Sequence, residues 1–184
     1  PLRALARDGV PEPREVRVFQ PPPAYQVTIA ERIGYRSYGH AMFFGENPPY
    51  GALITFWADP GDSGESARIR VVSEEGEEVA DLSRPAQPGM NRFAWDLRGT
   101  GDDGSPGGFR GRGPLVLPGS YQVEVTVGER SAGAWLEVRP DPRRSVSAED
   151  RRANLEATEE VTGWVAVALE GEERLAEIRA LRER

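Results

Sequence analysis

The feature that most constrains the fold is a succession of short segments in which apolar and polar residues alternate. Clear examples are Ala67–Val72 and Tyr121–Val127, where every second residue is apolar. A period of two is typical of a β-strand with one buried face. Turns containing Gly or Pro separate these segments, and about seven strands follow one another in this way. We therefore predict a mainly β fold, an Ig or fibronectin III-like β-sandwich of two packed sheets.

One predicted strand contributes aromatic residues to the core of this sandwich. In Asn91–Leu97, the side chains of Phe93, Trp95 and Leu97 share one face. Because alternate residues of a strand point to the same side, we expect all three to be buried. The Gly-rich stretch that follows, residues 98–118, is too long for a hairpin turn and is predicted as a loop.

The predicted strands divide the 184-residue chain into three parts. We place the sandwich at residues 39–139, an extended segment with one or two strands at residues 1–38, and a linker with a helical tail at residues 140–184. The first part is expected to be extended because its prolines, including the triple proline Pro21–Pro23, disfavour helix. Within it, Glu15–Gln20 alternates as a strand does.

The tail carries the signals of an amphipathic helix. Ser147–Asp150 has the form of a capping box, so the helix is expected to begin there. Gly171 disfavours a helix interior, and we therefore favour a hairpin that turns near Gly171 over a single helix. Apolar residues recur at three-to-four spacing and form a predicted interaction surface, which packs on the sandwich or binds a partner: Leu155, Val161, Val165, Leu169, Leu175, Ile178 and Leu181.

Composition excludes several classes of partner. The net charge of −7 is spread along the chain without a basic stripe, which argues against nucleic-acid binding. The chain has no cysteine, so it has no disulfide framework and no thiolate metal site. No run approaches the ~20 apolar residues of a membrane span. We expect no nucleic-acid partner and no membrane-spanning segment.

Acidic residues in and beside the predicted loop are candidate ligands for a metal ion. Asp96, Asp102 and Asp103 would offer oxygen ligands to Ca²⁺, which prefers such hard donors. Their spacing does not match an EF-hand loop, so a solvated loop is the favoured interpretation. We predict no cofactor and no resident metal.

The residues available for catalysis form no recognisable pattern. His40, the sole histidine, has no accompanying nucleophilic serine motif and no second histidine for a metal pair. Glycoside hydrolysis requires a pair of carboxylates, and the candidates in this sequence are Glu46, Asp59 and Asp62. Such residues are common in turns, and we predict that the chain is not an enzyme.

Aromatic residues in the same region raise a separate hypothesis of sugar binding. Tyr50 and Trp57 would stack on sugar rings if they were exposed. The favoured interpretation places Trp57 and Trp95 in the core and Glu46 in a turn.

Two motifs connect the chain to known families. Pro88–Asp96, a loop and then Leu117–Val123 follow the pattern PG-x-N-x-F-x-WD and PG-x-Y-x-V, which resembles the Ig-like domain of flagellar hook-capping proteins. Together with Gly45–Ala52, and with Val138–Arg143 leading into the capping box, these motifs resemble the C-terminal region of large bacterial exported proteins. Those proteins carry sortilin-like or BNR-repeat β-propellers and are often described as glycosyl hydrolases.

The resemblance implies an accessory module that is secreted, periplasmic or at the cell surface. The S-x-D-x-G-x-T-W turn of such propeller blades does not occur in this sequence, so any hydrolase activity would lie in an upstream propeller. The expected function is a non-catalytic structural or protein-interaction module, whose partner is that propeller, another chain or a second copy. One alternative is a carbohydrate-binding accessory module of a glycosyl hydrolase. A minor alternative is a filament subunit whose strand Glu15–Gln20 joins a neighbour's sheet.

Overall fold

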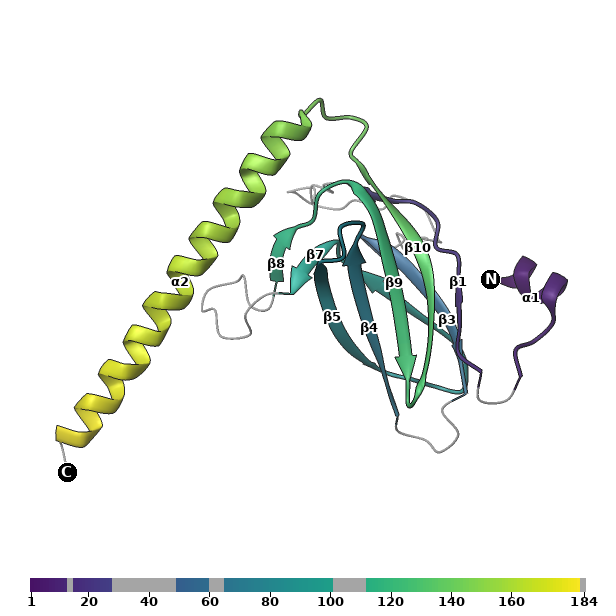
Figure 1. The fold of residues 1–184 in the computed structure, drawn as a ribbon, viewed down its shortest axis with the longest axis horizontal. Helices are drawn as coiled ribbons and strands as arrows, with labels where there is room; N and C mark the ends of the chain where they lie inside the picture. The colour runs from purple at the N-terminus through teal and green to yellow at the C-terminus, as the bar shows by residue number, and fades with distance from the viewer. Residues whose placement is uncertain (13–14, 28–48, 60–64, 101–111, 183–184) are drawn as a thin grey trace, which may run out of the picture.

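The computed structural model describes residues 1–12, 15–27, 49–59, 65–100 and 112–182. Within these residues the chain is mainly β, with several sheets and a long C-terminal helix (Figure 1). The predicted mainly β class with a helical tail is confirmed at this level. We refer to residues 17–140, which contain all the described strands, as the β region.

One sheet has three antiparallel strands. It contains β1 (Arg17–Phe19), β3 (Ala52–Ala58) and β6 (Gly89–Trp95), with β3 in the centre. The strands β3 and β6 pair along their whole length, from Ala52 opposite Trp95 to Ala58 opposite Gly89.

A second sheet has five strands in the order β2, β10, β9, β4 and β5. Their bounds are β2 (Ala24–Gln26), β4 (Ser66–Ser73), β5 (Glu78–Pro85), β9 (Gly119–Val127) and β10 (Arg130–Pro140). All neighbours are antiparallel except β2 and β10, which run parallel. The predicted strands at Ala67–Val72 and Tyr121–Val127 are therefore confirmed, and both extend slightly beyond the expected bounds.

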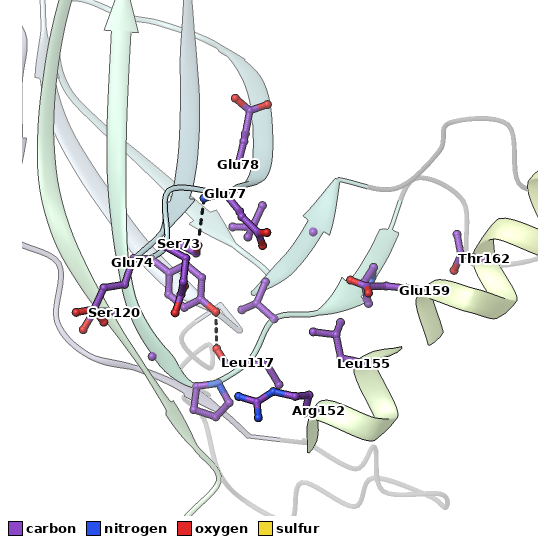
Figure 2. Close-up of a pocket in the computed structure, with 18 residues that line it drawn as sticks. Ser73, Glu74, Glu77, Glu78, Leu117, Ser120, Arg152, Leu155, Glu159 and Thr162 are labelled. Carbon is purple, nitrogen blue, oxygen red and sulfur yellow. Dashed lines mark hydrogen bonds between the residues drawn. The ribbon is translucent and has the colours of Figure 1, made fainter. Parts of the chain in front are cut away.

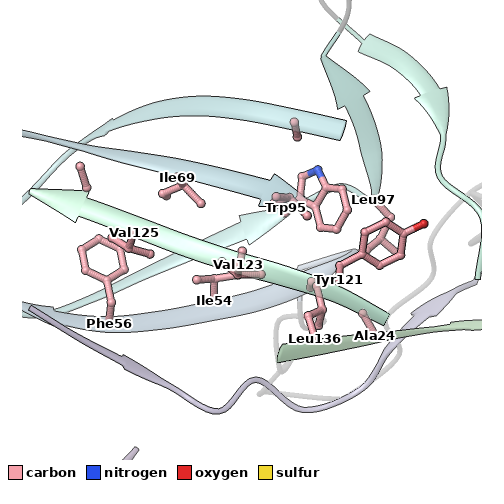
Figure 3. Close-up of a cluster of buried hydrophobic side chains, with 14 of the residues drawn as sticks. Ala24, Ile54, Phe56, Ile69, Trp95, Leu97, Tyr121, Val123, Val125 and Leu136 are labelled. Carbon is pink, nitrogen blue, oxygen red and sulfur yellow. The ribbon is translucent and has the colours of Figure 1, made fainter. Parts of the chain in front are cut away.

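Side chains from both sheets contribute to one hydrophobic core cluster (Figure 3). Alternate residues of β4 and β9 point into it, as their sequence period predicts, and alternate residues of β3 also contribute to it. Trp95 and Leu97 are buried as expected, and Phe93 is half-buried against the cluster. The Trp95 ring meets the Tyr121 ring edge to face, with 5.9 Å between centroids, a favoured aromatic geometry.

Part of the predicted loop at residues 98–118 is a small two-stranded sheet, so that prediction is wrong for its ends. β7 (Arg98–Thr100) pairs antiparallel with β8 (Arg112–Leu115). Two side-chain contacts anchor the pair: the Trp95 indole donates to the Arg98 carbonyl at 2.8 Å, and the Arg98 guanidinium donates to the Gly113 carbonyl at 3.2 Å. The pairing joins residues on either side of a long connection, which local pattern cannot reveal.

The N-terminal segment is more structured than the predicted extended connector. α1 (Leu2–Asp8) is a short helix, because Leu, Ala and Arg are strong helix formers and the next proline after Pro1 is Pro11. After it, β1 pairs with β3 and β2 pairs with β10 of the same chain. The predicted boundary at residue 39 thus separates strands that pair with one another, and β1 finds its partner within its own chain.

The tail forms one continuous helix, α2 (Ala148–Arg182), so the favoured hairpin at Gly171 is wrong. A glycine costs about 1 kcal/mol in a helix interior. Strong helix formers on both sides, such as Leu169–Glu170 and Arg174–Leu175, offset this cost.

Candidate interaction surface

A buried carboxylate shapes the turn between β10 and α2. The Asp141 carboxylate accepts hydrogen bonds from the Arg143 guanidinium at 2.7 Å and from the Arg143 backbone N–H at 3.0 Å. These donors stabilise the charged form and lower the pKa of Asp141 to about 2. Asp141 is only 3% exposed, and its bonds to Arg143 fix the turn by which the chain leaves β10.

Ser147 caps the first turn of α2, as the sequence predicts. Its hydroxyl oxygen accepts from the Asp150 backbone N–H at 3.0 Å, and the hydroxyl also donates to the Asp150 carboxylate at 2.7 Å. The acidic residues Glu149 and Asp150 lie in this turn, where the helix dipole favours negative charge.

The first turns of α2 border a groove of about 570 Å³ against the β region (Figure 2). Arg152, Leu155 and Glu159 point from the helix toward this groove, and Leu117 lines its other side. Leu155 is half-buried, as is Leu169 further along. We call this side of α2 the inner face.

The opposite side of α2 carries exposed apolar side chains. Trp164 is 63% exposed, Leu175 54% and Ile178 61%. Together with their neighbours they recur at alternating spacings of four and three residues, and we call this set the outer stripe: Ala157, Val161, Trp164, Ala168, Gly171, Leu175 and Ile178. Residues at this spacing align along one side of a helix.

The outer stripe points away from the β region. At about 100° per residue, Leu155 and Leu169 of the inner face lie roughly opposite Trp164 and Leu175. The exposure of the side chains agrees with this, because the inner-face leucines are half-buried and the outer residues are exposed. The helix therefore uses one face within the chain and presents the other to solvent.

Opposite charges flank the outer stripe. Glu160 lies beside Val161 near its start, and Arg174 lies beside Leu175 near its end; both side chains are exposed. Within the chain, the Arg174 guanidinium pairs with Glu170, one turn away. Glu160 and Arg174 are about 21 Å apart along one helix, too far to pair with each other in the same chain.

The seven predicted interaction residues divide between the inner face, the outer stripe and the exposed flanks of α2, where Val165 and Leu181 lie. Leu155 and Leu169 belong to the half-buried inner face. The other five, Val161, Val165, Leu175, Ile178 and Leu181, are exposed. Two further apolar residues of α2 are exposed, Trp164 at 63% and Val167 at 70%. From the sequence, Trp164 is expected to be a good interface anchor if it is exposed, whereas Val167 was not predicted.

Most of the predicted metal and catalytic candidates lie outside the described residues. This applies to Asp102 and Asp103 of the Ca²⁺ candidate, to His40, and to Glu46 and Asp62. Asp96 is half-buried after β6, and Asp59 is half-buried after β3. Among the residues that the structure describes, no three His, Cys, Asp or Glu side chains gather as a metal site would require.

The aromatic residues proposed for sugar binding form no single platform. Trp95 is buried, and Trp57 is half-buried with its ring nitrogen enclosed. Tyr50 is 38% exposed. The most exposed aromatic residue in the described part of the β region is instead Trp135 on β10, at 54%, which the sequence pattern did not assign to this role.

Paired charges cover the outer surface of the five-stranded sheet. Arg68 bonds to Asp81 across β4 and β5, and Arg70 pairs with Glu78 and Glu124 on its two neighbouring strands. The Arg68 guanidinium lowers the pKa of Asp81. These cross-strand pairs make the outer surface of the sheet polar.

None of the described helices combines the length and the apolar content needed to cross a membrane. Comparison of the chain with protein-family models, with curated proteins and with solved structures gives no match.

Proposed function

We propose that this chain is a non-catalytic structural and protein-interaction module of a larger exported β-propeller protein, with α2 as its docking element. The observation that carries the docking role is the division of α2 into a half-buried inner face and an exposed outer stripe. An apolar helix face left in water gains free energy when a partner covers it, at roughly 25 cal/mol per Å² of apolar surface. The exported context rests on the sequence motifs that resemble such proteins.

The β region supports an Ig-like sandwich as the body of this module. If β1, β3 and β6 are strands A, B and E, and β4, β9 and β10 are strands C, F and G, these six strands are divided between the two sheets as in an Ig domain, while β2 and β5 extend the second sheet. The Tyr121 hydroxyl donates to the Leu117 carbonyl at 2.6 Å, near the start of β9. This is the place and geometry of the tyrosine corner in Ig domains.

Photocrosslinking in the parent protein tests the docking role. A photoreactive amino acid at Ile178, in the outer stripe, is expected to form a covalent product with a neighbouring domain or a second protein. The same group at Glu156, exposed outside the stripe, is the matched control and should give much less product. If neither position crosslinks, α2 is not a docking element.

The absence of hydrolase activity in the isolated chain is a second expected result, and turnover of a glycoside would contradict the non-catalytic role.

Carbohydrate binding is a second candidate, favoured by the exposure of Trp135. Its ring stands on the outer surface of β10, where an aromatic side chain can stack on a sugar. Tyr25 is 41% exposed on the neighbouring strand, but it lies beside Arg139, which donates to its hydroxyl. A glycan array tests this candidate: binding that disappears in Trp135→Ala would support it, and an array without a ligand would exclude it for the glycans displayed.

A further inference from the structure

We propose that α2 pairs antiparallel with α2 of a second copy of this chain, about a two-fold axis near residue 166. This inference rests on the proposed docking role of α2 and names its partner. A second copy fits the outer stripe because the sizes and charges of the side chains along α2 complement those of the same helix running in the opposite direction.

The outer stripe has the spacing of a helix-pairing seam. From Ala157 to Ile178 its positions alternate between steps of four and three residues, the a and d pattern of a coiled coil. All of these positions are exposed. A second helix that packs on the outer stripe would not contact the inner face, because the β region lies on the opposite side of α2.

Large and small residues match when the helix is reversed about residue 166. Trp164 then faces Ala168 of the partner subunit, and Val161 faces Gly171 of the partner subunit. Gly171 has open space around it, because a side-chain carbon added there would meet nothing within 4 Å, so a neighbouring side chain can approach it closely. A parallel pair would instead stack Trp164 on Trp164 of the partner subunit and Gly171 on Gly171 of the partner subunit, which leaves one layer crowded and another hollow.

Charge also favours the reversed arrangement. In this register Glu160 lies beside Arg174 of the partner subunit, and the two-fold axis repeats the pair. The flanking Val167 meets Val167 of the partner subunit at the centre. In a parallel pair, Arg174 would instead lie beside Arg179 of the partner subunit, where like charges repel.

Two measurements on the full chain test the existence and the direction of the pair. Light scattering over a concentration series should show a monomer–dimer equilibrium. The chain has no cysteine, so one introduced cysteine carries one spin label. Labels at Glu156→Cys should stand about 30 Å apart along the helix axis, while labels at Val167→Cys should lie at nearly the same height. A chain that remains monomeric at all concentrations overturns the inference, and so do labels at 156 that lie at the same height.

A charge exchange tests the register. Glu160→Arg and Arg174→Glu should each raise the dimer dissociation constant roughly tenfold, because two attractive pairs become repulsive. The double variant should restore it. Glu156→Arg is the matched control, exposed on the same helix but outside the seam, and it should leave the constant nearly unchanged. Failure of the double variant to recover would exclude this register.

These outcomes separate the pair from the docking role itself. If residue 178 crosslinks to a different protein or domain while the chain stays monomeric, the docking role stands and self-pairing is wrong. If the crosslinked peptide is α2 of a second copy, both are supported. If the chain is monomeric and residue 178 gives no product, both are wrong.

Discussion

Gly51 ties the start of β3 to the end of β6 through a close backbone approach. It has φ of 103°, a left-handed conformation that favours glycine. A side-chain carbon at this position would lie 1.9 Å from the carbonyl oxygen of Trp95. Since that oxygen belongs to the backbone of a core strand, no shift of a flexible side chain can relieve the overlap.

We predict that Gly51→Ala destabilises the fold by about 3 kcal/mol or more, because it combines strain with a backbone clash. Gly76→Ala is the matched control: Gly76 also has positive φ, at 89°, but a side-chain carbon there meets nothing within 4 Å. That variant should cost about 1 kcal/mol. Urea unfolding measures both, and equal losses would contradict the clash.

Tyr121 makes the free energy of unfolding depend on pH in the alkaline range. Burial raises the pKa of Tyr121 to about 12, and the negative charge of Glu75 adds to this effect. The unfolded chain releases the phenolic proton near pH 10, whereas the folded chain retains it up to about pH 12. The folded state therefore loses stability relative to the unfolded state as pH rises through this window.

We predict that Tyr121→Phe costs about 1 kcal/mol at neutral pH, because the Leu117 carbonyl loses its donor. The difference between wild type and variant should shrink as pH rises from 10 toward 12, since only the wild type carries the buried phenol. Urea unfolding at about pH 8, 10 and 11 measures the trend. A constant difference across these pH values would show that Tyr121 does not cause the dependence.

At the scale of elements, the start of α2 is fixed by a side-chain cap in addition to its contacts with the β region. The Ser147 hydroxyl satisfies the Asp150 N–H, and the acidic first turn complements the helix dipole. The helix then extends far beyond its contact with the β region (Figure 1). Removing the cap would leave the Asp150 N–H without this acceptor.

We predict that Ser147→Ala destabilises the first turn of α2 by about 1 kcal/mol. Ser145→Ala is the matched control, because Ser145 is exposed and precedes the cap. Amide hydrogen exchange at residues 149–152 measures the effect. Equal exchange rates in the two variants would show that the cap contributes little.

At the scale of the whole molecule, the core and the tail are largely separate. Every residue of the buried hydrophobic cluster lies between Ala24 and Val138. α2 adds half-buried contacts near Leu155 but no fully buried side chain among its described residues. The stability of the β region should therefore not depend on the tail.

We predict that a chain ending at residue 147 unfolds in urea within about 1 kcal/mol of the full chain, since its core is intact. Loss of several kcal/mol, or failure to fold, would show that α2 supports the core. Light scattering of the shortened chain should show a monomer at every concentration.

The local elements follow from the sequence alone. The period of two in β4 and β9 determines both the strands and the residues that face the core, because alternate side chains of a strand point to opposite sides. The capped start of α2 follows from Ser147 in the same way, since capping involves only residues close in the chain.

Only the tertiary structure decides how these elements combine. β2 pairs parallel with β10, although the two strands are far apart in sequence. β7 pairs antiparallel with β8, which lies on the other side of a long connection. The position of the β region decides which apolar residues of α2 are covered, so Leu155 faces inward and Trp164 faces solvent. Helical spacing defines both faces, but the pattern of one segment carries no information about what lies beside it.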